Sequence, residues 1–291
     1  MPARESESLI LRTYPYREAD LVVSFVSREQ GKLRGIARAA RRPKSRWGSG
    51  LESLAHVRLF YFLRENQELA RLDRCELQSP PLFLKADYSV SVAQAFVAEV
   101  SEKLLPEHEP NDAYFRLLLL VLDEMKEGVN GKLTTVPATS PGNAEGPVVA
   151  SNGPADATSK PRTAGPLSSE VPVWLRRTLV YFALWSLRLG GWLAPLNVCV
   201  QSGVELGPEE TAYFDRGQDG LYSADFRNAD SWPLSALSRQ LARSMLRHSL
   251  PDLRESLGQS ANQADLFRFL TQRLEFHFEQ RLKSAAVLSQ L

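Results

Sequence analysis

The sequence predicts an α+β protein in two parts, a small N-terminal β-barrel over residues 1–79 and an all-α domain over residues 80–291. Three observations predict this division. Short β-forming stretches follow one another through the first eighty residues, and apolar residues recur at helical spacing after residue 86. Residues 1–78 carry fifteen Lys or Arg and ten Asp or Glu, whereas the remainder has a net charge of −4. A basic module joined to a mildly acidic one is typical of a protein with one nucleic-acid face.

The first three strands are expected at residues 8–13, 20–27 and 32–39. Pro15 is expected to end the first strand, because proline cannot donate a hydrogen bond to a central ladder. A polar turn joins the second and third strands, with Gly31 at a position where φ can be positive.

Two more strands are expected at residues 53–63 and 67–77. Five strands with no helix between them must close on themselves, because open edges promote unwanted pairing. The OB-fold is the commonest barrel of this kind that binds nucleic acid, so we predict an OB-fold. An SH3-like barrel remains open at this point, since counting strands does not distinguish the two.

The third strand and the loop that follows it carry the densest positive charge. Residues 28–46 contain eight Lys or Arg against one acid, Glu29. Such a cluster repels itself and is tolerated where a phosphate backbone binds, although a solvated loop is the simpler alternative. Trp47 follows and can either stack on a base or pack on the barrel. The candidate DNA-binding residues are Lys32, Arg34, Arg38, Arg41, Arg42, Lys44, Arg46 and Trp47.

Residues 7–54 (ESLILRTYPYREADLVVSFVSREQGKLRGIARAARRPKSRWGSGLESL) carry a family resemblance. They resemble the N-terminal region of the RecO family of DNA repair proteins, in which an acidic segment, a Gly-Lys turn and a basic loop follow in this order. The glycine usual before the basic run is Ala39 here, a change that stiffens the entrance to the loop. The matching residues are Glu18, Asp20, Gly31, Lys32, Ala40, Arg41, Arg42, Pro43, Lys44, Ser45 and Arg46.

Apolar spacing in the remainder predicts helices at residues 86–105, 113–125, 173–193, 234–248 and 263–284. Asn111 or Asp112 is expected to cap the second of these helices. Gly190-Gly191 ends the third, and His277 lies on the core stripe of the last as a half-buried histidine.

The segment 127–171 interrupts the helical domain. It is rich in Gly, Pro, Ser, Thr, Ala and Asn and almost devoid of aromatic residues. Such a composition cannot bury enough apolar surface to offset its ordering entropy, so the segment is predicted to be a disordered, passive insertion.

The chain has two cysteines, Cys75 and Cys199, too few for a disulfide framework. The resemblance implies a zinc module of two C-x-x-C pairs after the third helix, but Ser202, Ser223 and Phe226 stand at the other ligand positions. One thiolate cannot hold a tetrahedral zinc ion, so no metal and no cofactor are expected. The degenerate zinc-module-like loop, residues 195–230, is expected to be held by packing of Leu206, Tyr213, Phe214 and Tyr222.

No catalytic motif is apparent, since the sequence lacks a phosphate-binding P-loop and a nucleophile elbow. The resemblance instead implies a non-catalytic mediator of homologous recombination in the RecF pathway. Such proteins bind single- and double-stranded DNA and anneal complementary strands. With RecR, they load RecA onto DNA coated by single-strand DNA-binding protein. Arg281 and Lys283 are candidate rim residues for the acidic, apolar tail of that protein. The alternative is a protein-interaction scaffold whose basic loop binds an acidic partner.

We expect a cytoplasmic, nucleoid-associated protein without a membrane partner. The first eight residues include charged side chains and no apolar signal segment. The most apolar window, residues 178–187, is too short to span a bilayer and is flanked by arginines.

Overall fold

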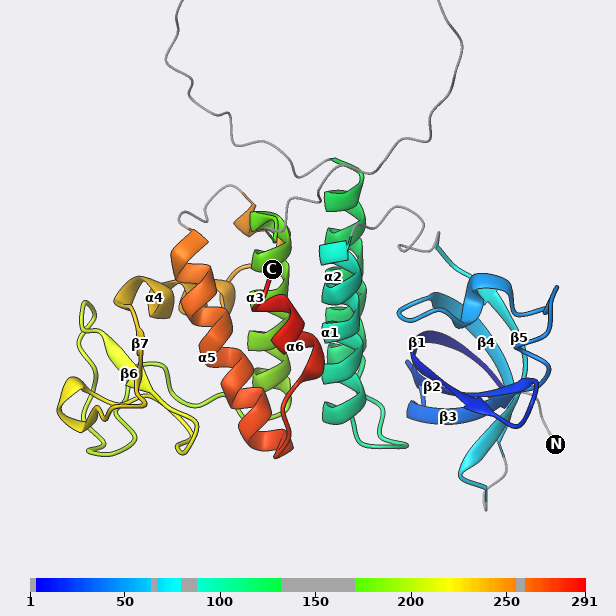
Figure 1. Cartoon of the computed structure of the whole chain (residues 1–291), viewed down its shortest axis with the longest axis horizontal. Helices are drawn as coiled ribbons and strands as arrows, with labels where there is room; N and C mark the ends of the chain where they lie inside the picture. The colour runs from blue at the N-terminus through cyan, green and yellow to red at the C-terminus, as the bar shows by residue number, and fades with distance from the viewer. Residues whose placement is uncertain (1–3, 64–66, 80–87, 132–170, 255–259) are drawn as a thin grey trace, which may run out of the picture.

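The computed structural model describes residues 4–63, 67–79, 88–131, 171–254 and 260–291. It has a β-barrel at the N-terminal end and a helical part. On the side away from the barrel, the helical part carries a loop-rich region with two short strands (Figure 1). The barrel ends with β5 at Leu77, and the first helix begins at Tyr88.

Five strands close the barrel in the order β1-β2-β3-β5-β4. The β3–β5 pair is parallel, and the other four pairs are antiparallel. This is the OB-fold, so the predicted fold class is confirmed. The strands are β1 (Arg4–Tyr16), β2 (Asp20–Ser27), β3 (Gly31–Ala37), β4 (His56–Phe62) and β5 (Leu69–Leu77).

The expectation that Pro15 ends the first strand is wrong. β1 continues to Tyr16, and Pro15 lies opposite Leu21 of β2. β4 pairs with β1 only as far as Leu9, so Pro15 has a strand neighbour on one side only. A residue without an N–H is tolerated at such an edge position.

The helical part contains six helices among the described residues, and α1, α2, α3 and α5 are the long ones. Asn111 caps α2 as predicted, because its side chain accepts a hydrogen bond from the Tyr114 N–H. The helices are α1 (Tyr88–Leu104), α2 (Asp112–Val129), α3 (Val173–Leu189), α4 (Ala236–Met245), α5 (Ser260–Phe278) and α6 (Lys283–Leu288).

Two predicted helix boundaries are wrong. The single helix expected at 263–284 is two helices, since α5 ends at Phe278 and α6 begins at Lys283. The Glu99 carboxylate of α1 accepts hydrogen bonds from the N–H groups of Lys283 and Ser284, which satisfies the start of α6. Helix α2 also extends to Val129, so the first residues of the expected insertion are helical. The prediction of disorder for 132–170 lies outside the described residues.

The zinc-module-like loop is held by packing, as expected, and also by two arginines that the sequence did not reveal. Cys199 is buried, and Leu206, Phe214 and Tyr222 are core residues. Buried Arg239 of α4 donates to the Leu196, Gly207 and Glu210 carbonyls. Buried Arg273 of α5 donates to the Asp215 and Gln218 carbonyls. The two guanidinium groups thus satisfy loop carbonyls that burial would otherwise leave unpaired. The described residues contain no group of three or more metal-binding side chains.

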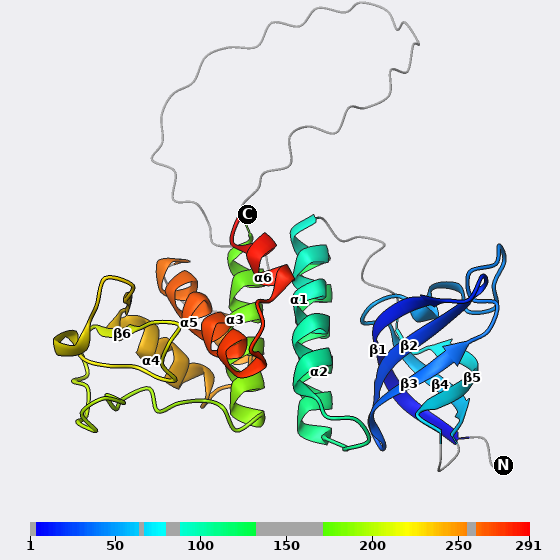
Figure 2. The same cartoon turned by 60° about the horizontal axis from the view of Figure 1, so that its bottom comes forward.

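Helix α1 and the loop that follows it lie beside the barrel and pack against β1, β2 and the start of β3 (Figures 1 and 2). The Glu102 carboxylate accepts a hydrogen bond from the Ser24 hydroxyl at 2.6 Å, and the Glu102 carbonyl accepts one from the Lys32 ammonium at 2.7 Å. Val26 on the outside of the barrel belongs to the same apolar core as Phe96 of α1. The barrel and the helices therefore share one buried interface.

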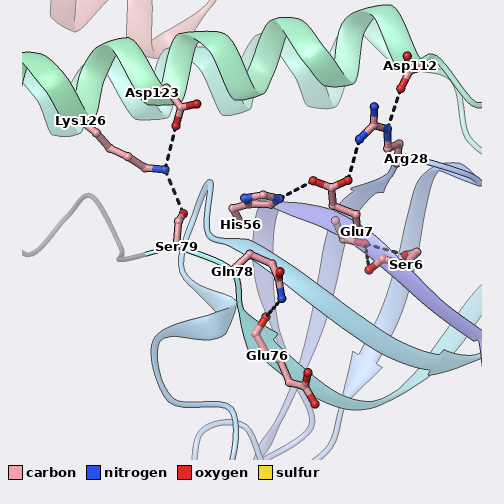
Figure 3. Close-up of polar contacts among 11 residues, drawn as sticks. Ser6, Glu7, Arg28, His56, Glu76, Gln78, Ser79, Asp112, Asp123 and Lys126 are labelled. Atoms are coloured by element: carbon pink, nitrogen blue, oxygen red, sulfur yellow. Dashed lines mark hydrogen bonds and ion pairs between the residues drawn. The ribbon is translucent and has the colours of Figure 1, made fainter.

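A second polar contact joins the barrel to α2 (Figure 3). The Arg28 guanidinium lies 2.9 Å from the Glu7 carboxylate and 2.8 Å from the Asp112 carboxylate. His56 lies 2.9 Å from the other oxygen of Glu7. Burial raises the pKa of Glu7, but the hydrogen bonds from Arg28 and His56 outweigh it and leave that pKa below its ordinary value. Lys126 of α2 donates to Ser79 at 3.0 Å, which adds a further contact.

Substitution of Gly31 tests how closely the barrel and the helical part approach one another. Its φ is +72°, and a Cβ there would lie 2.2 Å from the Glu109 carbonyl oxygen. Gly48 has φ +50° but nothing within 4 Å of its Cβ position, so it is a matched control. We expect Gly48→Ala to cost about 1 kcal/mol of unfolding free energy through backbone strain. Gly31→Ala should cost about 1–3 kcal/mol more through the clash. If urea unfolding showed that both variants lose the same unfolding free energy, the close approach of Glu109 to Gly31 would be contradicted.

Candidate nucleic-acid interface

The chain between β3 and β4 forms a loop that is tied to the turn between β1 and β2. Ala39 has a φ of 54°, a left-handed conformation that glycine adopts more readily. Its N–H donates to the Asp20 carboxylate at 2.8 Å, and the Arg41 N–H donates to the Ala19 carbonyl at 2.9 Å. These bonds hold the entrance of the loop in place despite the strain at Ala39.

Trp47 anchors the far end of the loop inside the barrel. Its side chain is 3% exposed and belongs to the barrel core with Leu51. The indole N–H donates to the Arg38 carbonyl at 3.0 Å, which joins the two ends of the basic run. Of the two roles considered for Trp47, packing on the barrel is the one observed. A buried ring of this kind presents no free face to a base.

The loop between these anchors projects five cationic side chains into solvent. Within the described parts of the chain, no acidic side chain forms an ion pair with any of them. The Arg46 guanidinium lies 5.1 Å from the centroid of the Trp47 ring, so the anchor also orients one of the cations. We call residues 38–46 the basic loop; its cations are Arg38, Arg41, Arg42, Lys44 and Arg46.

Lys32 and Arg34 differ from these five cations, because Lys32 is buried and Arg34 is ion-paired. Lys32 is 7% exposed, and burial lowers the pKa of its ammonium. Arg34 forms an ion pair with Glu107 at 3.0 Å. Both residues alternate with inward-facing residues on β3 as the sequence indicates, but the chain around Glu102 covers Lys32, whereas Arg34 stays exposed and is paired with Glu107. The proximity of a segment seventy residues away could not be read from the local pattern.

The helical part contains a groove that includes one of the two predicted rim residues. Its volume is about 490 Å³, and Arg281 lines it, whereas Lys283 does not. The sequence reasoning missed Arg268, whose guanidinium lies 4.4 Å from the centroid of the exposed Trp232 ring. The helical spacing of the α5 residues that line the groove is the signal that could have found it: Ala264, Phe267, Arg268, Thr271 and Glu275.

Fold and surface together define a class of protein: an OB-fold barrel with an exposed basic loop, joined to a helical domain with a groove lined by arginines. Comparison with known proteins then identifies the family. Residues 1–81 match the family model described as the N-terminal domain of recombination protein O, and residues 174–286 match the model of its C-terminal domain.

Named relatives agree with this sequence over most of its length. The DNA repair protein RecO of Koribacter versatilis is 37% identical over 288 residues, which are 99% of each chain. The protein of the same name from Anaeromyxobacter sp. strain Fw109-5 is 26% identical over 97% of this chain and 94% of its own. This chain therefore belongs to the RecO family of DNA repair and recombination proteins, as the N-terminal motifs predicted. Among the described helices, none is both long and apolar enough to cross a membrane.

The anchoring role of Trp47 has a direct test. Trp47→Ala should lower the unfolding free energy by about 3–5 kcal/mol, because it removes a large buried ring. Trp47→Phe retains most of the packing but loses the hydrogen bond to Arg38, and should cost about 1–2 kcal/mol. Denaturant unfolding of the two variants measures both losses. An unchanged unfolding free energy for Trp47→Ala would show that the ring is not a core residue.

Proposed function

We propose that this protein is a non-catalytic recombination mediator of the RecF pathway that binds single- and double-stranded DNA through its basic loop. It anneals complementary strands and, together with RecR, helps to load RecA onto DNA coated by single-strand DNA-binding protein. It acts in the cytoplasm at the nucleoid. The observation that carries this proposal is a loop anchored at both ends with five exposed cations, none of which is ion-paired with an acidic side chain among the described residues.

Binding through the basic loop rests on electrostatics. Each Lys or Arg that neutralises a phosphate releases condensed counterions, and this release drives association without reading sequence. Because contacts to phosphate leave the base edges free, a bound strand can still pair with its complement. The same cations reduce repulsion between the two strands as they approach, so annealing requires no chemical step and no cofactor.

The groove in the helical part is the proposed site for single-strand DNA-binding protein. Trp232, Phe267 and Leu288 supply apolar surface, and Arg268 and Arg281 supply positive charge. An acidic, apolar protein tail matches both features. In the described chain no acidic side chain forms an ion pair with Arg268 or Arg281, so both can bind an added carboxylate.

The role of the basic loop is tested by the salt dependence of DNA binding. We expect Arg41→Ala/Arg42→Ala to weaken binding to all sequences alike. It should also reduce the magnitude of the log–log salt slope for single-stranded DNA by about 1.4, since each lost phosphate contact contributes about 0.7. Fluorescence anisotropy of a labelled oligonucleotide, titrated across salt concentrations, measures the slope.

Arg188→Ala/Arg247→Ala removes two exposed arginines from the helical part and is the matched control. If the wild-type slope persisted in the Arg41/Arg42 variant, the basic loop would not bind phosphate. Binding of an acidic protein at the loop without any binding of DNA would favour the scaffold alternative.

The groove assignment is tested with a labelled peptide that carries the C-terminal tail of single-strand DNA-binding protein. Arg281→Ala should weaken peptide binding by about tenfold, the loss expected for one charge-assisted hydrogen bond. Lys283→Ala removes a nearby cation that does not line the groove and should leave binding unchanged. Equal effects of the two variants would indicate general electrostatic attraction rather than a site in this groove.

A further inference from the structure

The outer face of β4 and β5 carries two aromatic rings, each beneath an arginine. Phe60 and Phe62 are partly exposed, whereas their neighbour Tyr61 faces the barrel core. Phe60 lies opposite Arg74 of β5, and Phe62 lies opposite Arg71. The guanidinium carbons lie 4.0 Å and 4.9 Å from the respective ring centroids. We call these four residues the aromatic–arginine face.

Neither ring serves as part of the protein interior. The barrel core contains Leu59 and Tyr61 from β4, and neither Phe60 nor Phe62 belongs to it or packs against it among the described residues. Aromatic rings are large apolar groups and are normally buried. Two of them side by side on the outside of a strand, with arginines above them, indicate a surface that contacts a ligand.

The surface that OB-folds commonly use for nucleic acid is covered in this protein along β2 and at the start of β3. That surface lies on the second and third strands. Here Ser24 is bonded to Glu102, Val26 is part of the helical core, and Lys32 is buried against α1. A DNA strand held by the basic loop therefore cannot continue across the outer face of β2 or over Lys32 at the start of β3, whereas Arg34 is exposed and Ile36 partly exposed further along β3.

The aromatic–arginine face is continuous with the basic loop by another route. β3 and β5 are parallel neighbours, and Ile36 of β3 is in register with Arg71 of β5. Ile36 is partly exposed and precedes Arg38, the first cation of the basic loop, by two residues on the same side of the strand. The outer faces of β3, β5 and β4 thus lead from the loop to Phe62 and Phe60.

We propose that the aromatic–arginine face is a base-stacking site for single-stranded DNA that enters from the basic loop, a role that rests on the proposed function and deepens it. Unpaired bases stack on aromatic rings and on guanidinium planes, and the arginines can also contact phosphates. Glu76 lies 3.6 Å from Arg74, but an exposed pair of this kind is weak and can open. Bases in a duplex are already stacked on one another, so this face distinguishes single strands from duplexes, whereas the basic loop binds both.

The test compares the binding of three forms of DNA by one variant. Phe60→Leu/Phe62→Leu retains apolar side chains on the strand but removes both ring faces. Its affinity for a single-stranded oligothymidine should fall by about 5- to 150-fold, since the loss of one stacked base costs about 1–3 kcal/mol. Its affinity for a duplex of the same length, and for an abasic strand, should be unchanged. Phe60→Tyr/Phe62→Tyr should retain binding to the single strand.

Phe276→Leu is the matched control, because Phe276 is an exposed ring beside Arg273 on the helical part. It should leave all three affinities unchanged. The proposal is overturned if Phe60→Leu/Phe62→Leu binds the single strand as the wild type does, if it loses the duplex equally, or if its self-association changes. Different results would contradict the proposed function: a wild-type protein that binds neither single-stranded nor duplex DNA, or an Arg41/Arg42 variant that binds both forms as the wild type does.

Discussion

The contact of α1 with the outer face of β2 and with the start of β3 determines which surfaces of this protein remain free. Glu102 is central to it, because its side chain bonds Ser24 and its carbonyl accepts a hydrogen bond from Lys32. A buried ammonium requires such a partner, since an unpaired charge in the interior costs several kcal/mol. Gly31 allows the chain at Glu109 to approach within contact distance. The result is a barrel in which the outer face of β2 and the start of β3 are covered, while the basic loop is left exposed.

In the basic loop, the residues that hold the backbone in place are not the residues that carry the positive charge. Asp20 and Trp47 fix the two ends through hydrogen bonds to Ala39 and Arg38, and none of these interactions uses a cationic side chain. The arginines can therefore project into solvent while the backbone beneath them is fixed. A surface of this kind binds phosphates in any sequence context, which suits a protein of a recombination family.

Local patterns in the sequence were sufficient for the barrel and for most of the helices. The strand at 20–27 was predicted with its observed ends, and the Asn111 cap was one of the two residues expected at that position before an apolar helix. The basic run was also visible, because charge density does not depend on tertiary structure.

The features that the sequence did not reveal all depend on residues far apart in the chain. The local pattern predicts that Lys32 is an outward-facing, solvated cation, and only the fold brings Glu102 beside it. The break between α5 and α6 depends on Glu99, which lies more than 180 residues earlier. The stacking of Arg74 on Phe60 depends on a β4–β5 register that shifts between Phe60 and Tyr61. Such pairings follow from tertiary packing, and local propensity does not encode them.

Hydrogen–deuterium exchange of the full-length protein, with and without single-stranded DNA, tests the central claim most directly. Bound DNA should slow exchange in the basic loop, residues 38–46, and leave residues 22–26 of β2 and the α1 segment around Glu102 unchanged. Slower exchange at β2 and around Glu102, with no change in the basic loop, would contradict the claim. It would mean that DNA displaces the helix and binds the covered face of the barrel.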